Sequence, residues 1–308
     1  MSTYALPAIT YSPSIISNQL VSNLNTDQTQ QAQLEVQLST GDLVNAPSDN
    51  PAAASSLMKL NSSLSRAQQY VTNANDGIGW LSLGTSTLGS VISTLQQAQQ
   101  SVQALSGNAL SGSQAALTGT AAQLQSTMSQ VLNLANTTYG NQAIFSGTGN
   151  VSQAYDSAGN YVGGGNSPTR SVAPGVTVPV SVTGPQVFGT GSSGLLGSSG
   201  VLQTLINDVQ TGTPASLQKA TTTDLAALGS ALQNVESQAA AMGASYQRMQ
   251  AFSTEATNAQ TALQTQISSI DSVNLAQATT QLTQDQQTYQ TGLWATAQIE
   301  QHSLVSYL

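Results

Sequence analysis

The sequence contains no cysteine and very little charge. Without cysteine there is no disulfide, no thiolate nucleophile and no thiolate metal ligand. The single histidine, His302, cannot build a histidine metal site by itself. Charged residues make up 6% of 308 residues, whereas about a quarter is usual. These absences predict a protein that is not an enzyme and that holds no cofactor and no metal.

Basic residues are the scarcest charges, with five Lys and Arg against 13 Asp and Glu, for a net charge of −8. So few cations cannot neutralise a run of phosphates or an anionic bilayer surface. No apolar run approaches the ~18 residues of a membrane span. Residues 1–20 lack the Lys or Arg and the continuous apolar core of a cleaved Sec signal. The composition therefore predicts no nucleic-acid partner, no membrane partner and no cleaved Sec signal.

One glycine pattern superficially matches a dinucleotide-binding loop. Gly189, Gly191 and Gly194 have the required spacing, and Asp208 follows at about the expected distance. A dinucleotide site needs a strand–helix–strand unit with the acid at the end of the second strand. Asp208 instead falls in a segment with a helical pattern, so we interpret the glycines as a flexible linker.

The stretch from Pro214 to about Ile270 has the strongest periodicity. Apolar residues recur every seventh position, and a second apolar series lies three residues before the first, as in a coiled-coil seam. Thr213 and Pro214 suit an N-cap and a first helical position. Because the predicted helix is longer than a compact domain is wide, it needs partner helices. The main series is Leu228, Val235, Met242, Met249, Ala256, Leu263 and Ile270.

Shorter helical patterns precede this stretch. One begins at Ile15 and ends at Gly41, and another restarts at Asn50-Pro51, where Asn50 suits an N-cap. Gly77 and Gly79 predict a kink or break in the second helix. Further helices are expected around 88–105, 117–138 and 201–209.

The middle of the chain differs in composition. Glycines and prolines concentrate between about 145 and 190, and Val176–Val182 alternates apolar and polar residues as a strand does. Pro179 restricts that strand to an edge or a bulge. A hairpin is expected between Tyr155 and Tyr161.

These patterns predict a mainly α fold: a long antiparallel coiled-coil-like helical bundle formed by N- and C-terminal arms, with a small β-rich insertion domain. The predicted segments are a helical core segment at 1–42 that pairs with 272–308, the two halves of a helical rod at 43–142 and 193–271, and a β-rich outer insertion at 143–192.

The terminal segments carry only acidic charge, because no Lys or Arg occurs before Lys59 or after Arg248. Their pairing must therefore rest on apolar contacts and amide hydrogen bonds, and we expect them to become ordered when neighbouring subunits pack on them. The residues predicted to pack within the bundle or between subunits are Ile16, Leu20, Leu24, Leu34, Leu38, Leu228, Val235, Met242, Met249, Leu263, Ile270, Leu282, Tyr289, Leu293, Leu304 and Leu308.

Several blocks resemble bacterial flagellins. Leu38-Ser-Thr-Gly41 and the following Ser48-Asp-Asn-Pro51 are similar to the N-terminal signature of that superfamily, as is Asn73-Ala-Asn-Asp-Gly-Ile78. The blocks at 134–148 and 303–308 are most similar to its hook-associated branch. On these motifs, which extend over roughly 15–150 and 200–308, the chain is identified as a member of the bacterial flagellin superfamily. The residues of the motif loop and cap are Gly41, Asn45, Ser48, Asp49, Asn50 and Pro51.

The resemblance implies a structural part of the bacterial flagellum, located outside the cell and exported through the flagellar type III apparatus. Subunits would form a ring that joins the hook, through another hook-associated protein, to the first flagellin subunits. An export chaperone that binds the C-terminal segment is a further expected partner. The alternatives are a filament flagellin or the first hook-associated protein, and, from a different class, a secreted coiled-coil adhesin or translocator.

Overall fold

The structure is a computed structural model that describes residues 13–108, 114–149 and 151–305. The chain forms two compact units. The first, which we call the terminal unit, comprises Met1–Ser65 and Thr261–Leu308. The second, the central unit, comprises Arg66–Gln260. The chain is mainly α with two small antiparallel sheets, which confirms the predicted fold class.

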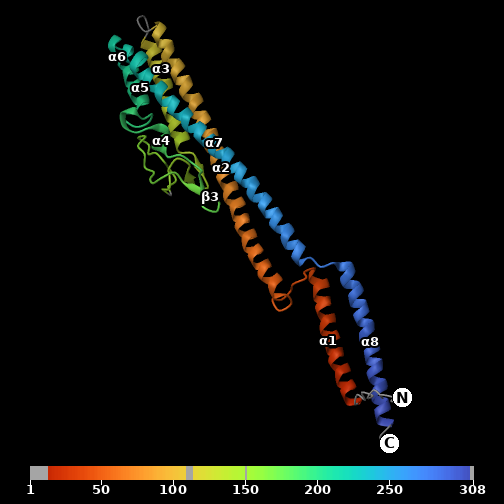
Figure 1. The fold of residues 1–308 in the computed structure, drawn as a ribbon. Coiled ribbons are helices and arrows are strands. Elements are labelled where there is room, and N and C mark those ends of the chain that lie inside the picture. The colour runs from red at the N-terminus through yellow and green to blue at the C-terminus, as the bar shows by residue number, and fades with distance from the viewer. Residues whose placement is uncertain (1–12, 109–113, 150, 306–308) are drawn as a thin grey trace, which may run out of the picture. The chain divides into compact units, whose positions relative to one another are not determined.

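The terminal unit is built on two helices, α1 (Pro13–Thr40) and α8 (Leu275–Val305), which lie side by side in Figure 1 and contact each other. Helix α1 ends where Gly41 adopts a φ of 82°, a left-handed conformation that glycine reaches without the steric cost of a Cβ. This is the helix end that the sequence predicts.

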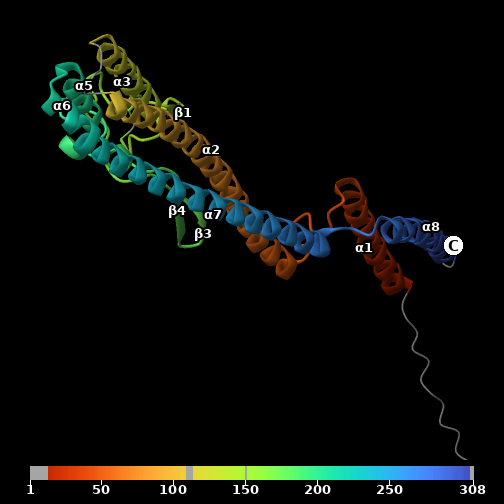
Figure 2. The same cartoon turned by 90° about the horizontal axis from the view of Figure 1, so that it is seen from above.

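The chain forms three further long helices between α1 and α8. They are α2 (Pro51–Asn108), α3 (Gln114–Ala135) and α7 (Leu225–Asp271). In the central unit α2 and α7 run alongside each other in both views (Figures 1 and 2). Of the kink or break predicted at Gly77 and Gly79, the break is wrong, because α2 is helical from Pro51 to Asn108.

Packing against α7 explains the α2 glycines. A Cβ added at Gly77 would lie 2.5 Å from Met249 Cε, and one added at Gly84 would overlap Met242 Cε. The two glycines are seven residues apart, as are the two methionines, so each methionine of α7 occupies the space that a missing α2 side chain leaves. Here glycine permits close helix packing, and backbone flexibility is not its role.

Two hairpin-like pairs are present: β3 (Thr169–Ala173) with β4 (Val176–Pro179) inside the expected β insertion, and β1 (Thr138–Tyr139) with β2 (Gln142–Ala143) at its N-terminal boundary, mostly before residue 143. The strand predicted through Val182 ends at Pro179, and the β3–β4 register is irregular. A bridge also joins Tyr155 to Tyr161, as expected.

The β3 strand is fastened to α2 by polar contacts. Arg170 Nε donates to Asp76 Oδ2 at 2.7 Å, and Asn73 Nδ2 donates to the carbonyl of Ser171 at 2.8 Å. These contacts connect residues nearly a hundred positions apart in the sequence, so the insertion is held against the helical part of the central unit.

An irregular helical turn directly precedes α7. Short helices α4 (Gly184–Phe188), η1 (Gly191–Ser193) and α5 (Val201–Thr211) lead to α6 (Pro214–Lys219), which continues through a π-helical turn, η2 (Ala220–Asp224), into α7. Thr213 caps α6 by accepting from Ser216 N–H at 3.2 Å, as the sequence predicts. The heptad pattern does not predict the π turn.

Candidate functional site

The terminal unit exposes most of the large apolar side chains that remain uncovered. Among the described residues, Val162 is the one strongly exposed large apolar residue that belongs to the central unit. Exposed apolar surface of this kind marks interaction sites, and tryptophan is a frequent anchor in them. Trp294 is 78% exposed. The other terminal-unit members are Ile15, Val21, Val36, Leu43, Met58, Leu275 and Leu293.

The packing between α1 and α8 buries few side chains. Within the described part of these helices, Gln37 and Ala278 are the side chains classed as buried, and most apolar residues between the helices are half-buried. A two-helix pair with so little buried area is marginal in water. The terminal unit therefore has apolar surface available for additional helices.

The predicted packing residues divide by burial. Those of the α7 seam in the central unit are buried, and the others that the structure describes are half-buried or exposed. The buried ones are Leu228, Val235, Met242 and Met249. The half-buried ones are Leu20, Leu24, Leu34, Leu38, Leu263, Ile270, Leu282 and Tyr289, and Leu293 is exposed. The side chains of Ile16 and Leu304 and the whole of Leu308 lie outside the described residues.

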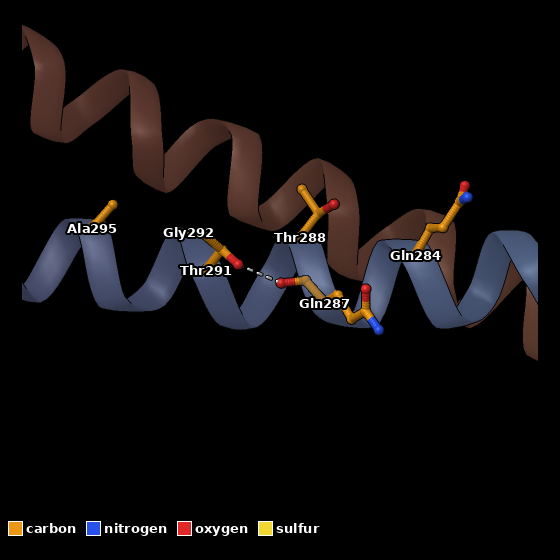
Figure 3. Close-up of a pocket in the computed structure, with 6 residues that line it drawn as sticks. All are labelled: Gln284, Gln287, Thr288, Thr291, Gly292 and Ala295. Atoms are coloured by element: carbon orange, nitrogen blue, oxygen red, sulfur yellow. Dashed lines mark hydrogen bonds between the residues drawn. The ribbon is translucent and has the colours of Figure 1, made fainter.

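Uncharged polar side chains line a groove on each helix of the pair. The groove on α8 is lined by Gln284, Gln287, Thr288, Thr291, Gly292 and Ala295 (Figure 3). The groove on α1 is lined by Thr26, Thr29, Gln30, Gln33, Leu34 and Gln37. Threonine hydroxyls here bond back to their own helix, as Thr291 Oγ1 does to the carbonyl of Gln287 at 2.8 Å (Figure 3). The grooves thus present small side chains and glutamine amide groups against which another helix could pack.

The linkers that flank the helix pair bind each other. Val44 N–H donates to Asp271 Oδ1 at 3.0 Å, and Val273 N–H donates to the carbonyl of Gly41 at 3.1 Å. Asp42 and Ser272 form an antiparallel bridge between the two linkers. The entry to α2 and the exit from α7 are therefore joined at this point.

The motif loop before α2 owes its shape to side-chain acceptors. Asp49 Oδ2 accepts from Asn45 and Ala46 N–H groups at 3.2 and 2.9 Å, and Asn50 Oδ1 accepts from Ala53 N–H at 3.0 Å. Ser48 Oγ lies 3.5 Å from Asp49 Oδ1. Pro51 is the first residue of α2. The loop and cap positions proposed from the sequence thus have local hydrogen-bonding roles.

Two helix residues that bind the linkers, one in α1 and one at the end of α7, are not identified by the sequence patterns. Asp271 directly follows the last apolar residue of the α7 series and accepts from the opposite linker, and buried Gln37 donates from Nε2 to the carbonyl of Leu43 at 2.9 Å. Their partners lie in another part of the chain or beyond the helix end. The only sequence signal for Asp271 is that an acidic residue directly follows the last apolar heptad position.

The central unit also holds a cluster of charged side chains around Lys219. Lys219 Nζ lies 2.5 Å from Asp208 Oδ2 and 3.6 Å from Asp224 Oδ1. Asp224 is buried in the π turn, and its Oδ2 has no hydrogen-bond partner. Burial, with a smaller contribution from the hydrogen bond to Asp208, raises the pKa of Asp224 to about 6. Burial is the largest effect on Asp208 and acts to raise its pKa, but the hydrogen bonds with Lys219 and Asp224 and the positive charge of Lys219 together outweigh it, and the pKa is lowered.

This cluster connects α5 to the start of the long seam helix. Asp208 is the acid whose sequence spacing from the glycines matches the dinucleotide-binding pattern. It lies inside α5 and forms an ion pair with Lys219.

Across residues 13–108, 114–149 and 151–305, no group of three or more His, Cys, Asp or Glu residues is placed to hold a metal. No helix in these ranges is long and apolar enough to cross a membrane.

The fold defines a class of proteins in which the first and last helices of the chain pair with each other and a β-rich segment is inserted between long helices. Matches to two family profiles identify this class of proteins. The bacterial flagellin N-terminal helical region matches residues 12–150, and the bacterial flagellin C-terminal helical region matches residues 225–308. The chain belongs to the bacterial flagellin family.

Individual relatives carry narrower names. The chain is 31% identical over 179 residues to flagellar hook-associated protein 3 of Salmonella typhimurium, a match that covers 58% of this chain and 56% of that protein. The match thus spans little more than half the length of this curated relative.

Solved structures share the fold. A flagellar hook-associated protein from Vibrio parahaemolyticus superposes with a TM-score of 0.63 at 23% identity, over 73% of this chain and 100% of that one. The flagellar junction protein of Legionella pneumophila gives 0.52 at 17% identity, over 70% and 100%. At these identities the likeness establishes the fold alone.

Proposed function

We propose that this chain is a structural component of the bacterial flagellum that joins the hook to the filament. The observation that carries the proposal is the concentration of exposed apolar side chains on the terminal unit of a flagellin-family chain. The names of the relatives, hook-associated protein 3 and flagellar junction protein, support the narrower assignment within the family.

The terminal unit is the surface through which subunits would assemble. Segments 1–42 and 272–308 would supply the packing core, with one copy's α1 and α8 lying against the same helices of its neighbours. Trp294 and Leu293 are adjacent exposed residues on α8 and would anchor such a contact. Because α1 and α8 contain no Lys or Arg, the contact would rest on apolar area and on amide and hydroxyl hydrogen bonds.

The proposed partners follow from the position in the assembly. They are like subunits within a ring, another hook-associated protein on the hook side, flagellin on the filament side and, before export, a chaperone that binds the C-terminal segment. The protein would act outside the cell after export through the flagellar type III apparatus, and it would have no catalytic role.

Deleting the gene in its native bacterium tests the proposal. We expect bare hooks under the electron microscope and abundant unpolymerised flagellin in the medium, because filament subunits would be exported without a base on which to assemble. Bare hooks without any flagellin would identify the chain as the filament subunit itself. Normal filaments would refute a role at the junction.

A further inference from the structure

The register of the α1–α8 pair can be derived from one close contact. Gly292 of α8 lies under Leu24 of α1, since a Cβ added at Gly292 would be 2.8 Å from Leu24 Cδ2. In an antiparallel pair, a step of seven residues forward on one helix matches seven backward on the other. Gln31 therefore lies opposite Asp285.

Both residues of this layer have an unsatisfied buried atom. Gln31 Nε2 and Asp285 Oδ2 are each buried without a hydrogen-bond partner. One is a donor and the other is an acceptor, so each could satisfy the other. A buried polar atom without a partner is costly, and a carboxylate more so. The register places this donor and this acceptor opposite each other, so a hydrogen bond between them would favour this alignment.

No lysine or arginine is available in the pair to replace the amide. Neither α1 nor α8 contains Lys or Arg. The other acidic residue of α1 at this level, Asp27, is half-buried, and it is not among the residues with an unsatisfied buried oxygen. Gln31 is thus the donor that the register offers to Asp285.

Apolar contacts alone do not select the register. In the observed register Leu34 is placed opposite Leu282. A slip of seven residues in either direction would bring Leu34 opposite Tyr289 or Leu275, which are also apolar. Helix pairs with such interchangeable apolar layers depend on a polar residue to fix their alignment.

The polar layer does distinguish the three registers. The two slips would place Asp285 opposite Leu38 or Leu24, neither of which can donate a hydrogen bond. Among these registers, only the observed one places an amide donor opposite the carboxylate. We propose that the Gln31–Asp285 layer fixes the register in which α1 pairs with α8. This inference concerns pairing within one chain and does not rest on the proposed function.

Cysteine crosslinking of the full-length chain tests the proposal, because the native sequence has no cysteine that would interfere. Leu34→Cys is combined with Leu282→Cys for the observed register, or with Tyr289→Cys or Leu275→Cys for the two slipped ones. A short bis-maleimide then reports which pairs meet within a monomer. In the otherwise native chain, we expect Leu282→Cys to crosslink at least tenfold more than either slipped partner.

The same pairs are then measured with Gln31→Leu and Asp285→Leu together. We expect the slipped pairs to crosslink to within about threefold of the observed pair, since all registers become apolar. The control places leucines at Gln28 and Gln286, two exposed positions of the same helices, and should retain the native preference. A preference that survives in the Gln31→Leu/Asp285→Leu chain would overturn the proposal, as would equal crosslinking of all pairs in the native background.

Discussion

Replacing Gly84 by leucine should destabilise the central unit, whereas the same change at Gly89 should stabilise it. Both glycines lie inside α2, so leucine removes a helix-propensity penalty of roughly 0.5–1 kcal/mol at either position. Gly89 is exposed, and a Cβ added there would have no other atom within 4 Å, but a Cβ at Gly84 would overlap Met242 Cε. Overpacking of this kind costs about 1–3 kcal/mol or more.

The two variants should consequently differ in unfolding free energy by about 1–3 kcal/mol. For a unit of this size, each kcal/mol shifts the melting temperature by about 2–4 °C. Thermal and urea unfolding followed by circular dichroism would measure the difference. Met242→Ala alone should also destabilise, by about 2–5 kcal/mol.

A double-mutant cycle makes the test specific to the contact. If Met242 occupies the space above Gly84, the combination Gly84→Leu/Met242→Ala should cost about 1–3 kcal/mol less than the sum of the single changes. Additive costs, or equal stability of the Gly84→Leu and Gly89→Leu chains, would show that the glycine–methionine packing described for α2 and α7 is wrong.

Three other predictions concern ionisation, capping and local stability. Asp224→Asn should raise the melting temperature most above pH 6, where the native carboxyl is charged and buried. The pKa of Asp224 in the folded chain is raised to about 6. The native chain therefore gains stability from this group as pH falls from above 6 towards about 4. Asp208→Asn should instead lower the melting temperature at neutral pH, and the reverse order would contradict the assigned charges. Asn50→Ala should cost about 1 kcal/mol at the start of α2, seen as faster amide exchange of its first turn, while Asn61→Ala, in the same helix, should not. In dilute monomer, amides of α1 and α8 should exchange at least about tenfold faster than those at the centre of α7; equal protection would count against a loosely packed terminal unit.

Periodicity predicts much of the helical architecture because burial repeats along a helix. The spacing of Leu228, Val235, Met242 and Met249 identifies them as core positions, and all four are buried. The caps at Thr213 and Asn50 are also visible in the sequence, because capping depends on residues three positions apart. Local chemistry thus carries this part of the prediction.

Glycine is harder to interpret. The sequence predicts a break at Gly77, but glycine there makes room for a methionine that lies more than 170 positions away along the chain. The helix context of α2 keeps the backbone regular, and the partner helix determines why a side chain is absent. Nothing local in the sequence distinguishes these two uses of glycine.

Polar residues between helices are missed for a similar reason. In the sequence, Gln31 and Asp285 are only polar interruptions of weak apolar stripes. Their relation appears only when Leu24 and Gly292 define the register of the pair. The π turn that buries Asp224 is equally invisible, because the heptad series begins after it.

The central claim is that the exposed apolar surface of the terminal unit makes this chain assemble into the flagellum. The most direct measurement is complementation of the deletion strain with Trp294→Asp or, as a control, Val162→Asp, which changes an exposed apolar residue of the central unit. With both variants secreted at equal levels, we predict bare hooks and free flagellin for Trp294→Asp and normal filaments for Val162→Asp. Normal filaments with Trp294→Asp and Leu293→Asp combined would contradict the claim.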